Sequence, residues 1–505
     1  MGSTHFVSLH IALAMSSSSV ILPSSLQFTC HVGDFQKPQG PILTGVGFLN
    51  HMIDQFNSHA QIGVSLQQAT DPANNGTTLE HAQDNDVEVM KQQENTYADL
   101  SLDDQKELLK LVGSELGSQL KLLLAATPSC GTASHFSCPL DEALVACKLT
   151  TTTATKPAQE EDRKEALSTG SLASFALAPY GCFPRRSGRS RVGGLRTHAL
   201  ESFWEGLAGS SGLNIRLEKL RGKNAHHIIE SAFKAFCRAL RNLLDGIDTT
   251  ECDYQHHDEA TAVSLSSAAA PTPLDRLFGV SSDNWNEGAS QNRQGSVQRK
   301  TKETSIDVSL RLSCVPSHDH VQVSTGITTL DSFFNALAQH ADMDLHVSCQ
   351  GDLWIDDHHS AEDVSIAIGQ ALTQALGSKA GLVRMWCATA TVGSSTIQVV
   401  MDLSNRPCFT HNLESLEAGH SERGEDGEND EMIGDLSIEM LEHVLDSLVV
   451  NARMTVHILE VQASSNLKDV LQAIAIAFGR ALKYCAMVDV RRCGATASSK
   501  GTLSV

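Results

Sequence analysis

Two short segments share one arrangement of histidine and glutamate. Residues 355–363 read IDDHHSAED, and residues 222–230 read GKNAHHIIE. In both, an adjacent pair of histidines precedes a glutamate, and the first histidine lies four residues before it. On a helix this spacing brings an imidazole and a carboxylate side by side, while the second ring points in another direction. Imidazole with carboxylate is a donor set typical of transition-metal sites, so the repeated motif predicts metal chemistry, with each segment able to serve two ions.

The composition indicates a protein of more than one domain, because a domain typically has roughly 100–200 residues and this chain has 505. Hydrophobic residues make up 41%, and the net charge of −21 argues against nucleic acid or an anionic membrane as a partner. The 13 cysteines show no tight pair spacing, and no segment approaches the ~18 consecutive apolar residues of a membrane helix. We therefore expect a soluble protein with reduced thiols, in the cytoplasm or a plastid.

Changes in composition divide the chain into two folded units. The serine-rich start carries no Lys, Arg, Asp or Glu and is assigned only as a leader. One Asn/Gln-rich stretch and one acidic stretch read as inserts, and a stretch rich in Ser, Ala, Asn and Gln has linker composition. We expect a leader at 1–24, a first unit at 25–255 with an insert at about 68–100, a linker at 256–298, and a second unit at 299–505 with an acidic insert at about 412–432.

The second unit repeats the pattern of the first. Residues 326–335, GITTLDSFFN, match residues 45–54, GVGFLNHMID, and a strand precedes each segment. Residues 150–194 are expected to be mostly loop, because they mix Thr, Ser, Gly and basic residues. Apolar periodicity in the first unit predicts a strand over 25–32, helices over about 49–56, 102–124, 195–207 and 226–244, and a strand over 213–217.

The two units have lost opposite halves of the histidine and glutamate set. In the first unit, the helix equivalent to the IDDHHSAED segment begins LDDQK, so we place Lys106 opposite His359 and Leu109 opposite Glu362. In the second unit, residues 468–472 read KDVLQ in place of HHIIE. Each unit keeps the half that the other lacks. A metal site built from both units explains this pattern.

These residues resemble imidazoleglycerol-phosphate dehydratase, an enzyme of histidine biosynthesis. The resemblance covers most of 25–250 and 299–505 outside the inserts. Members of that family carry all of its motifs in one copy, so the division between two units is unusual. The motifs are GFLNHMIDQ at 47–55, 222–236, TKET at 301–304, 356–363, DLSNRP at 402–407, and the tail from 491 to 501.

The resemblance implies a site with two Mn²⁺ ions and a substrate phosphate held by cations and polar groups. The donor set alone would not exclude zinc or iron. In the second unit Ser332 replaces His51, and in the first Ser202 replaces His443, a candidate further ligand. The implied metal ligands are His51, His226, His227 and Glu230 from the first unit and His358, His359, Glu362 and His443 from the second. The implied phosphate ligands are Gln55 and Lys234 from the first unit and Arg384, Arg406, Ser498 and Lys500 from the second.

The implied reaction removes water from the glycerol-phosphate side chain of an imidazole and gives imidazole acetol phosphate. The hydrogen lost is bound to carbon and is not acidic. Two metal ions on the ring nitrogens would stabilise the imidazolate, which can expel the neighbouring hydroxyl, and a carboxylate then removes the carbon-bound proton. Glu303 is the implied acid–base candidate, with Glu230 and Glu362 as carboxylates at the metals.

The resemblance also implies an α+β fold, in which each dehydratase-like unit has two similar halves, with sheets packed on helices, like the second domain of ribosomal protein S5. Family subunits form a large hollow shell and share metal ligands between neighbours, so we expect a large homo-oligomer. The main alternative is a catalytically inactive scaffold or binding descendant that keeps the fold, and the losses in the first unit favour it. A metal-storage or metal-sensing protein is a second alternative, but it would not need phosphate-binding residues.

Overall fold

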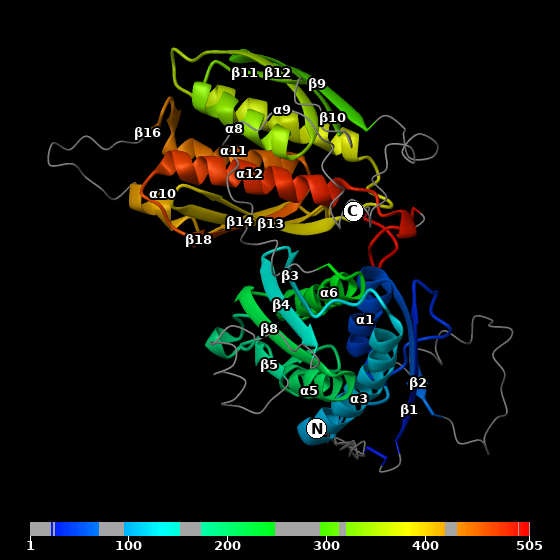
Figure 1. Ribbon diagram of the computed structural model, residues 1–505. Coiled ribbons are helices and arrows are strands. Elements are labelled where there is room, and N and C mark those ends of the chain that lie inside the picture. Colours follow the sequence, from blue (N-terminus) through cyan, green and yellow to red (C-terminus); the bar gives the residue numbers. More distant parts are fainter. Residues whose placement is uncertain are drawn as a thin grey trace, which may run out of the picture.

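The computed structural model describes residues 22–23, 26–69, 95–151, 173–247, 293–312, 320–419, 432–492 and 494–503. Most of the expected leader, linker and inserts lie outside these residues. Within them the chain forms two units of sheets and helices, which we call copy one (26–247) and copy two (293–503) (Figure 1). No described helix is both long enough and apolar enough to cross a membrane.

Copy one contains two main sheets. The first pairs β1 (Phe28–Asp34) antiparallel with β2 (Ile62–Gln68). The second has the order β3-β4-β8-β5, with β5 parallel to β8 and the other pairs antiparallel. Its strands are β3 (Ala133–Leu140), β4 (Ala143–Thr151), β5 (Ala173–Ala176) and β8 (Leu213–Arg221), and the short strands β6 (Arg191–Val192) and β7 (Leu195–Arg196) form a hairpin.

The helices of copy one pack on these sheets and on one another. The longest, α3, packs on α5 and β1, and α6 packs on β3 and β4. Close approach of α3 and α5 requires Gly113, because a Cβ there would lie 2.1 Å from the carbonyl oxygen of Phe203. The helices are α1 (Gly47–Gln55), which continues as the π-helical turn η1 (Phe56–Ala60), α3 (Leu102–Ala126), α5 (Leu200–Ser211) and α6 (Ala225–Leu244), with 3₁₀ turns η3 (Arg185–Ser187) and η4 (Thr197–Ala199).

Copy two repeats this plan with a fuller first sheet, which has the order β11-β12-β10-β9, and a second sheet of order β13-β14-β18-β15. Its strands are β9 (Gln294–Lys300), β10 (Thr304–Leu312), β11 (Val321–Ser324), β12 (Met343–Gly351), β13 (Met385–Val392), β14 (Ser395–Asp402), β15 (Cys408–His411), β16 (Met432–Ile433), β17 (Leu436–Ser437) and β18 (Thr455–Gln462). Its helices are α8 (Thr328–His340), α9 (His358–Leu376), α10 (Glu414–Gly419), α11 (Ile438–Asn451) and α12 (Leu467–Ala486), with the turn η6 (Val490–Arg492).

The second sheets of the two copies share one topology, and the antiparallel pair β1–β2 of copy one matches the pair β10–β12 of copy two, which confirms the predicted repeat and the α+β fold class. The second sheets match strand for strand, and both carry a register irregularity at the same place, between Leu144 and Val145 and between Thr396 and Ile397. One local expectation was wrong: the helix expected from 195 begins at Leu200, because residues 195–196 form β7. The region expected to be mostly loop, 150–194, contains the short strands β5 and β6, and its residues 152–172 lie outside the described ones.

Equivalent hydrogen bonds fix how α3 and α9 correspond. Gln105 Oε1 on α3 accepts the backbone N–H of Arg196 at 2.6 Å. Asp357 Oδ2, before α9, accepts the backbone N–H of Ser437 at 2.6 Å. Both N–H groups lie at the same position of the equivalent hairpins β6–β7 and β16–β17. Gln105 therefore corresponds to Asp357.

This register corrects one sequence-based correspondence. Placing Lys106 opposite His359 and Leu109 opposite Glu362 is wrong by one residue. Lys110 takes the position of Glu362, and Lys106 takes that of the first histidine in the pair. The equivalent helix of copy one thus presents two lysines where copy two presents an imidazole and a carboxylate.

The copies contact each other through their second sheets. Strand β3 of copy one packs on β13, β14 and β18 of copy two, and Phe136 meets Trp386 edge to face with ring centroids 6.5 Å apart. The C-terminal segment, red in Figure 1, reaches back to α1, and Gln55 Nε2 donates to Ser499 Oγ at 3.3 Å. The chain therefore places the tail of copy two against the helices of copy one.

We predict that Arg221→Ala weakens the contact between the copies. The Arg221 guanidinium in copy one donates to the carbonyl oxygens of Thr410 and Ile458 and to Asn412 Oδ1 in copy two, at 2.8–3.2 Å. Because hydrogen bonds of charged groups contribute about 1.5–3 kcal/mol, we expect a loss of that order in the free energy of unfolding, measured by urea denaturation. The matched control Arg311→Ala removes a half-exposed ion pair with Asp344 and should cost less than about 1 kcal/mol. Equal losses in the two variants would contradict the prediction.

Candidate metal and substrate site

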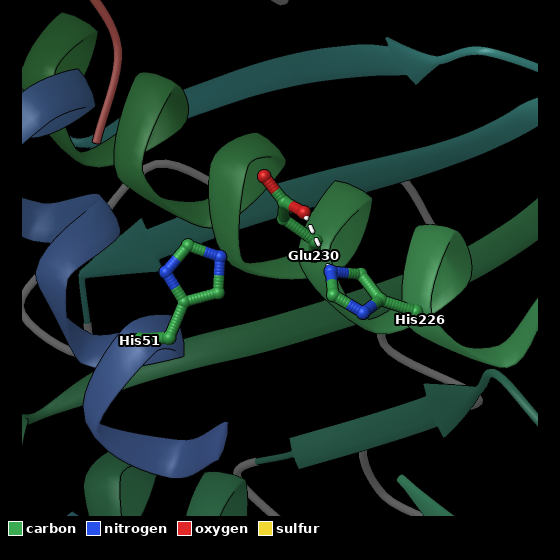
Figure 2. A group of neighbouring side chains, drawn as sticks. All are labelled: His51, His226 and Glu230. Atoms are coloured by element: carbon green, nitrogen blue, oxygen red, sulfur yellow. Dashed lines mark hydrogen bonds and ion pairs between the residues drawn. The ribbon is translucent and has the colours of Figure 1, made fainter. Parts of the chain in front are cut away.

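Three side chains of copy one converge on one point. His51 lies on α1, and His226 and Glu230 lie one turn apart on α6 (Figure 2). One ligand-type atom of each lies within 4.8 Å of the others, and His226 Nε2 lies 3.1 Å from Glu230 Oε2. The side chain of Asn224 accepts the backbone N–H of His226, which starts α6 there and puts both residues on the face toward α1. We call these three residues triad one.

The charges around triad one favour metal-binding protonation states. Burial alone would raise the pKa of Glu230, but the Lys234 ammonium, 2.8 Å from Oε1, and the bond to His226 hold it well below its usual range. Burial lowers the pKa of His51, which outweighs the attraction of Glu230. Triad one therefore offers an ionised carboxylate and a neutral imidazole, the forms that bind metal ions.

A second triad lies in copy two. His358 and Glu362 on α9 meet His443 on α11, again with ligand-type atoms within 4.8 Å of one another. Glu362 Oε1 lies 3.2 Å from His443 Nε2, and Glu362 Oε2 lies 3.7 Å from His358 Nε2. Asp356 caps the start of α9, because its Oδ1 accepts the backbone N–H of His358. We call these three residues triad two.

The second histidine of each pair does not join its own triad. His227 Nδ1 lies 2.7 Å from Glu142 Oε2, and His359 Nδ1 lies 3.2 Å from Asp352 Oδ2. Their partly exposed rings lie beside the triads, roughly perpendicular to the first rings. Each pair thus divides its two imidazoles between two directions, as the adjacent spacing predicted. Neither carboxylate was among the residues predicted for the site.

A cleft of about 330 Å³ joins triad one to copy two. Arg406 and Lys500, two of the predicted phosphate ligands, line it together with His226, His227 and Glu230. Arg406 Nε donates to Asp141 Oδ1 at 2.8 Å, whereas its buried Nη2 has no hydrogen-bond partner among the described residues. The cleft therefore combines three of the predicted metal ligands with three cations, because Arg189 lines it as well.

The other predicted phosphate ligands do not line this cleft. Arg384 is buried, donates to both oxygens of Asp402 at 2.7 and 2.8 Å and also bonds the carbonyl oxygen of Ala497, so it holds the C-terminal segment in place. Lys234 pairs with Glu230, and Gln55 contacts the segment through Ser499. Ser498 Oγ accepts the backbone N–H of Lys500 and thereby shapes the turn that presents this lysine.

The predicted acid–base residue Glu303 lies exposed in the turn between β9 and β10, where its backbone N–H is bound by Thr301 Oγ1. Hydrogen bonding to Asp352 raises the pKa of His359, and the charge of Glu303 acts in the same direction. Glu303 is therefore near triad two rather than triad one. Within the described residues, the convergent ligand groups form two separate triads, each inside one copy, and one chain does not bring all the predicted ligands to a single point.

The sequence is similar to that of one known protein family over both copies. A model of the family described as imidazoleglycerol-phosphate dehydratase matches residues 83–240 and again residues 325–482. Imidazoleglycerol-phosphate dehydratase 3, chloroplastic, from Triticum aestivum is 38% identical over 218 residues, which are 43% of this chain and 75% of that protein. The chain belongs to the imidazoleglycerol-phosphate dehydratase family.

A second plant relative supports this assignment. The chloroplastic imidazoleglycerol-phosphate dehydratase of Pisum sativum is 38% identical over 214 residues, covering 42% of this chain and 70% of its own length. A solved imidazoleglycerol-phosphate dehydratase from Staphylococcus aureus subsp. aureus N315 matches 39% of this chain and 99% of its own, with 26% identity and a TM-score of 0.32. Because the family model matches twice, this chain is a tandem double copy within a family of hydro-lyases.

The residues of both triads fit a divalent transition metal of the kind on which this family depends. Each triad offers two imidazoles and one carboxylate, and Zn²⁺, Mn²⁺ and Fe²⁺ accept such donors. Among the described residues, the buried His443 Nε2 has no hydrogen bond of acceptable geometry, although Glu362 Oε1 lies 3.2 Å away. A nitrogen that is desolvated and unbonded is poised for a ligand that the side chains do not supply. Three protein donors per triad leave positions for further ligands.

We predict that His457 makes the contact beneath the cleft sensitive to acid. Its Nε2 donates to the backbone carbonyl of Asp141 at 2.8 Å, and burial lowers the pKa of His457 to about 4. Below pH ~6.5 His457 becomes protonated in the unfolded chain but stays neutral in the folded chain. As the pH falls toward 4, this difference lowers the free energy of unfolding by at most about 1.4 kcal/mol per pH unit.

The variant His457→Gln keeps an amide donor but cannot titrate. Its free energy of unfolding, measured in urea at constant ionic strength, should fall less steeply between pH 7 and pH 5 than that of the parent protein. Parallel curves for the two proteins would show that His457 is not the group responsible.

Proposed function

We propose that this chain dehydrates imidazole glycerol phosphate to imidazole acetol phosphate, in the histidine-biosynthesis step for which its relatives are named, at a site completed between two chains. The observation that carries the proposal is the complementary pair of triads. Copy one keeps triad one, and its α3 presents Lys106 and Lys110 where triad two would lie. Copy two keeps triad two, and its α12 presents Lys468 and Gln472 where triad one would lie.

The complementary losses favour a meeting of triad one from one chain with triad two from another. His227 and His359 lie outside their own triads, so each is available to the opposite one. We propose that His51, His226 and Glu230 hold one Mn²⁺ with His359 of a second chain. His358, Glu362 and His443 would hold the other with His227 of a second chain. The metals would act as Lewis acids on the substrate's ring nitrogens and stabilise the imidazolate.

The remaining residues bind and orient the substrate. Arg406 and Lys500 line the cleft beside triad one, and the unused Nη2 of Arg406 suits a phosphate oxygen. Arg384 holds the segment that carries Ser498 and Lys500 and sets the position of the lysine. Glu303, near His359, would reach the substrate's hydroxyl or its carbon-bound proton once a second chain brings triad two to the cleft.

This arrangement requires a homo-oligomer, because a site closed between chains repeats until the assembly closes. A shell like that implied by the family resemblance satisfies the requirement. The plant relatives are named chloroplastic, which supports a plastid as the compartment. An inactive scaffold would need neither the ionised Glu230 nor an open cleft lined by cations.

The test is turnover of imidazole glycerol phosphate by the purified full chain loaded with Mn²⁺. We predict that Glu230→Gln, in triad one, and His359→Ala, beside triad two, each abolish activity, because each removes a ligand. Lys468→His should change little, since copy two lacks the other residues of triad one. Full activity of Glu230→Gln, or no turnover and no bound metal in the parent, would contradict the proposal and leave the scaffold.

Mixing the two inactive variants tests where the site closes. In a randomly mixed assembly, half of the triad-one sites and half of the triad-two sites are intact, so about a quarter of the parent activity should return if the triads meet between chains. Co-expression with two affinity tags provides the mixed assembly, and each variant expressed alone with both tags is the control. No recovery in verified mixed assemblies would show that one chain supplies the whole site.

A further inference from the structure

The carboxylate beside His227 is itself held rigidly. Glu142 lies in the turn between β3 and β4, where its Oε1 accepts the backbone N–H groups of Lys223 and Asn224 at 3.2 and 2.8 Å. Its Oε2 lies 2.7 Å from His227 Nδ1. With two backbone N–H donors on Oε1, the other carboxylate oxygen, Oε2, is placed to accept a hydrogen bond from the N–H at Nδ1. The backbone before α6 thus holds Oε1 of Glu142, and Oε2 of the same carboxylate holds the imidazole of His227.

His359, beside triad two, is also held at Nδ1 by a carboxylate, which comes from a different part of the fold. Asp352 follows β12 directly, is only 3% exposed, and has both oxygens 3.2–3.3 Å from His359 Nδ1. Buried carboxylates are costly unless they are paired, and the one side-chain partner that Asp352 shows among the described residues is this imidazole. Two unrelated turns therefore supply one carboxylate each to equivalent atoms of the two second histidines.

Each carboxylate is kept only in the copy that keeps its histidine. In copy two the β13–β14 turn has Ser394 at the position of Glu142, and α12 has Asp469 at the position of His227. In copy one α3 begins a turn earlier than α9, at Leu102, so it has no turn like that of Asp352. Packing alone would not couple these losses, because Glu142 and Asp352 lie in differently built turns.

We propose that Glu142 and Asp352 are positioning residues that fix the tautomer and orientation of His227 and His359. A carboxylate at Nδ1 holds the proton there and leaves the Nε2 lone pair free for a metal ion. This inference rests on the proposed function, since it takes both histidines as metal ligands. It assigns a role to two residues outside the predicted ligand set, and it explains how each pair sends one ring to its own triad and the other ring away from it.

The test replaces each carboxylate by its amide in the full chain, as Glu142→Gln and Asp352→Asn. An amide can donate to Nδ1, which moves the ring proton to Nε2 and removes the ligand lone pair without changing the size of the side chain. Mn²⁺ binding is measured by electron paramagnetic resonance of the free ion and by metal content after dialysis. We expect about 10–100-fold weaker binding at the affected metal in each variant.

Two further measurements separate positioning from structural support. The metal-free variants should unfold at the same temperature as the metal-free parent, because glutamine Oε1 can still accept the two backbone N–H groups. The control Asp344→Asn, in an ion pair with Arg311 on the open face of the first sheet of copy two, should bind Mn²⁺ like the parent.

The outcomes distinguish this inference from the proposed function. If the parent binds Mn²⁺ and both variants bind it equally well, the positioning role is wrong and the proposed function stands. If the parent binds no Mn²⁺, both are wrong. A lower unfolding temperature of the metal-free variants, in proportion to their loss of metal, would overturn the positioning role in favour of a structural one.

Discussion

Asp141, in the tight turn between β3 and β4, contacts both copy two and the candidate site. Its carboxylate pairs with Arg406 of copy two, its carbonyl accepts from His457 of copy two, and His227 Nε2 lies 3.7 Å away. This residue adopts φ 49°, where the equivalent turn of copy two has Gly393 at φ 53°. Aspartate adopts the left-handed region more readily than most residues, so the turn accommodates this carboxylate. One turn thus joins the copies, pairs with Arg406, a predicted phosphate ligand, and borders His227, a predicted metal ligand.

The contact between the copies determines which triad lies next to cations of the other copy. Packing β3 of copy one on β13, β14 and β18 brings Arg406 and the C-terminal tail of copy two to triad one. Triad two lies instead beside a separate, acidic cleft of about 600 Å³ lined by Glu439, Glu442 and Asp446. The two clefts consequently differ in charge, because the first is lined by three cations and two carboxylates, and the second by three carboxylates and no Lys or Arg. Complementary charge of this kind favours the meeting of unlike faces of two chains over the meeting of like faces.

Much of this architecture could be predicted from the sequence. The histidine and glutamate spacing identified both triads' helices, and the matched segments identified the repeat, because those features are local. The predicted correspondence of α3 with α9 was wrong by one residue. The Asp pair present in both segments suggested one alignment, but the hydrogen bonds of Gln105 and Asp357 show another. The burial of Arg384 and the carboxylates at His227 and His359 were also missed. They depend on contacts between residues far apart in the chain, and an acidic residue in a turn gives no sign of its partner.

The correspondence of Gln105 with Asp357 places two lysines of copy one at the positions of His358 and Glu362. A metal ion needs electron pairs directed at it, and an ammonium offers none while adding repulsion. With Lys106 and Lys110 in place of a ligand histidine and glutamate, that helix face repels a divalent cation from two positions four residues apart. The equivalent loss in copy two is milder, since Gln472 stays polar and neutral and Asp469 is acidic. These replacements disfavour a metal ion in copy one by charge and in copy two by the lack of donor groups. Each chain therefore carries triad one once and triad two once, and the described residues hold the two triads apart.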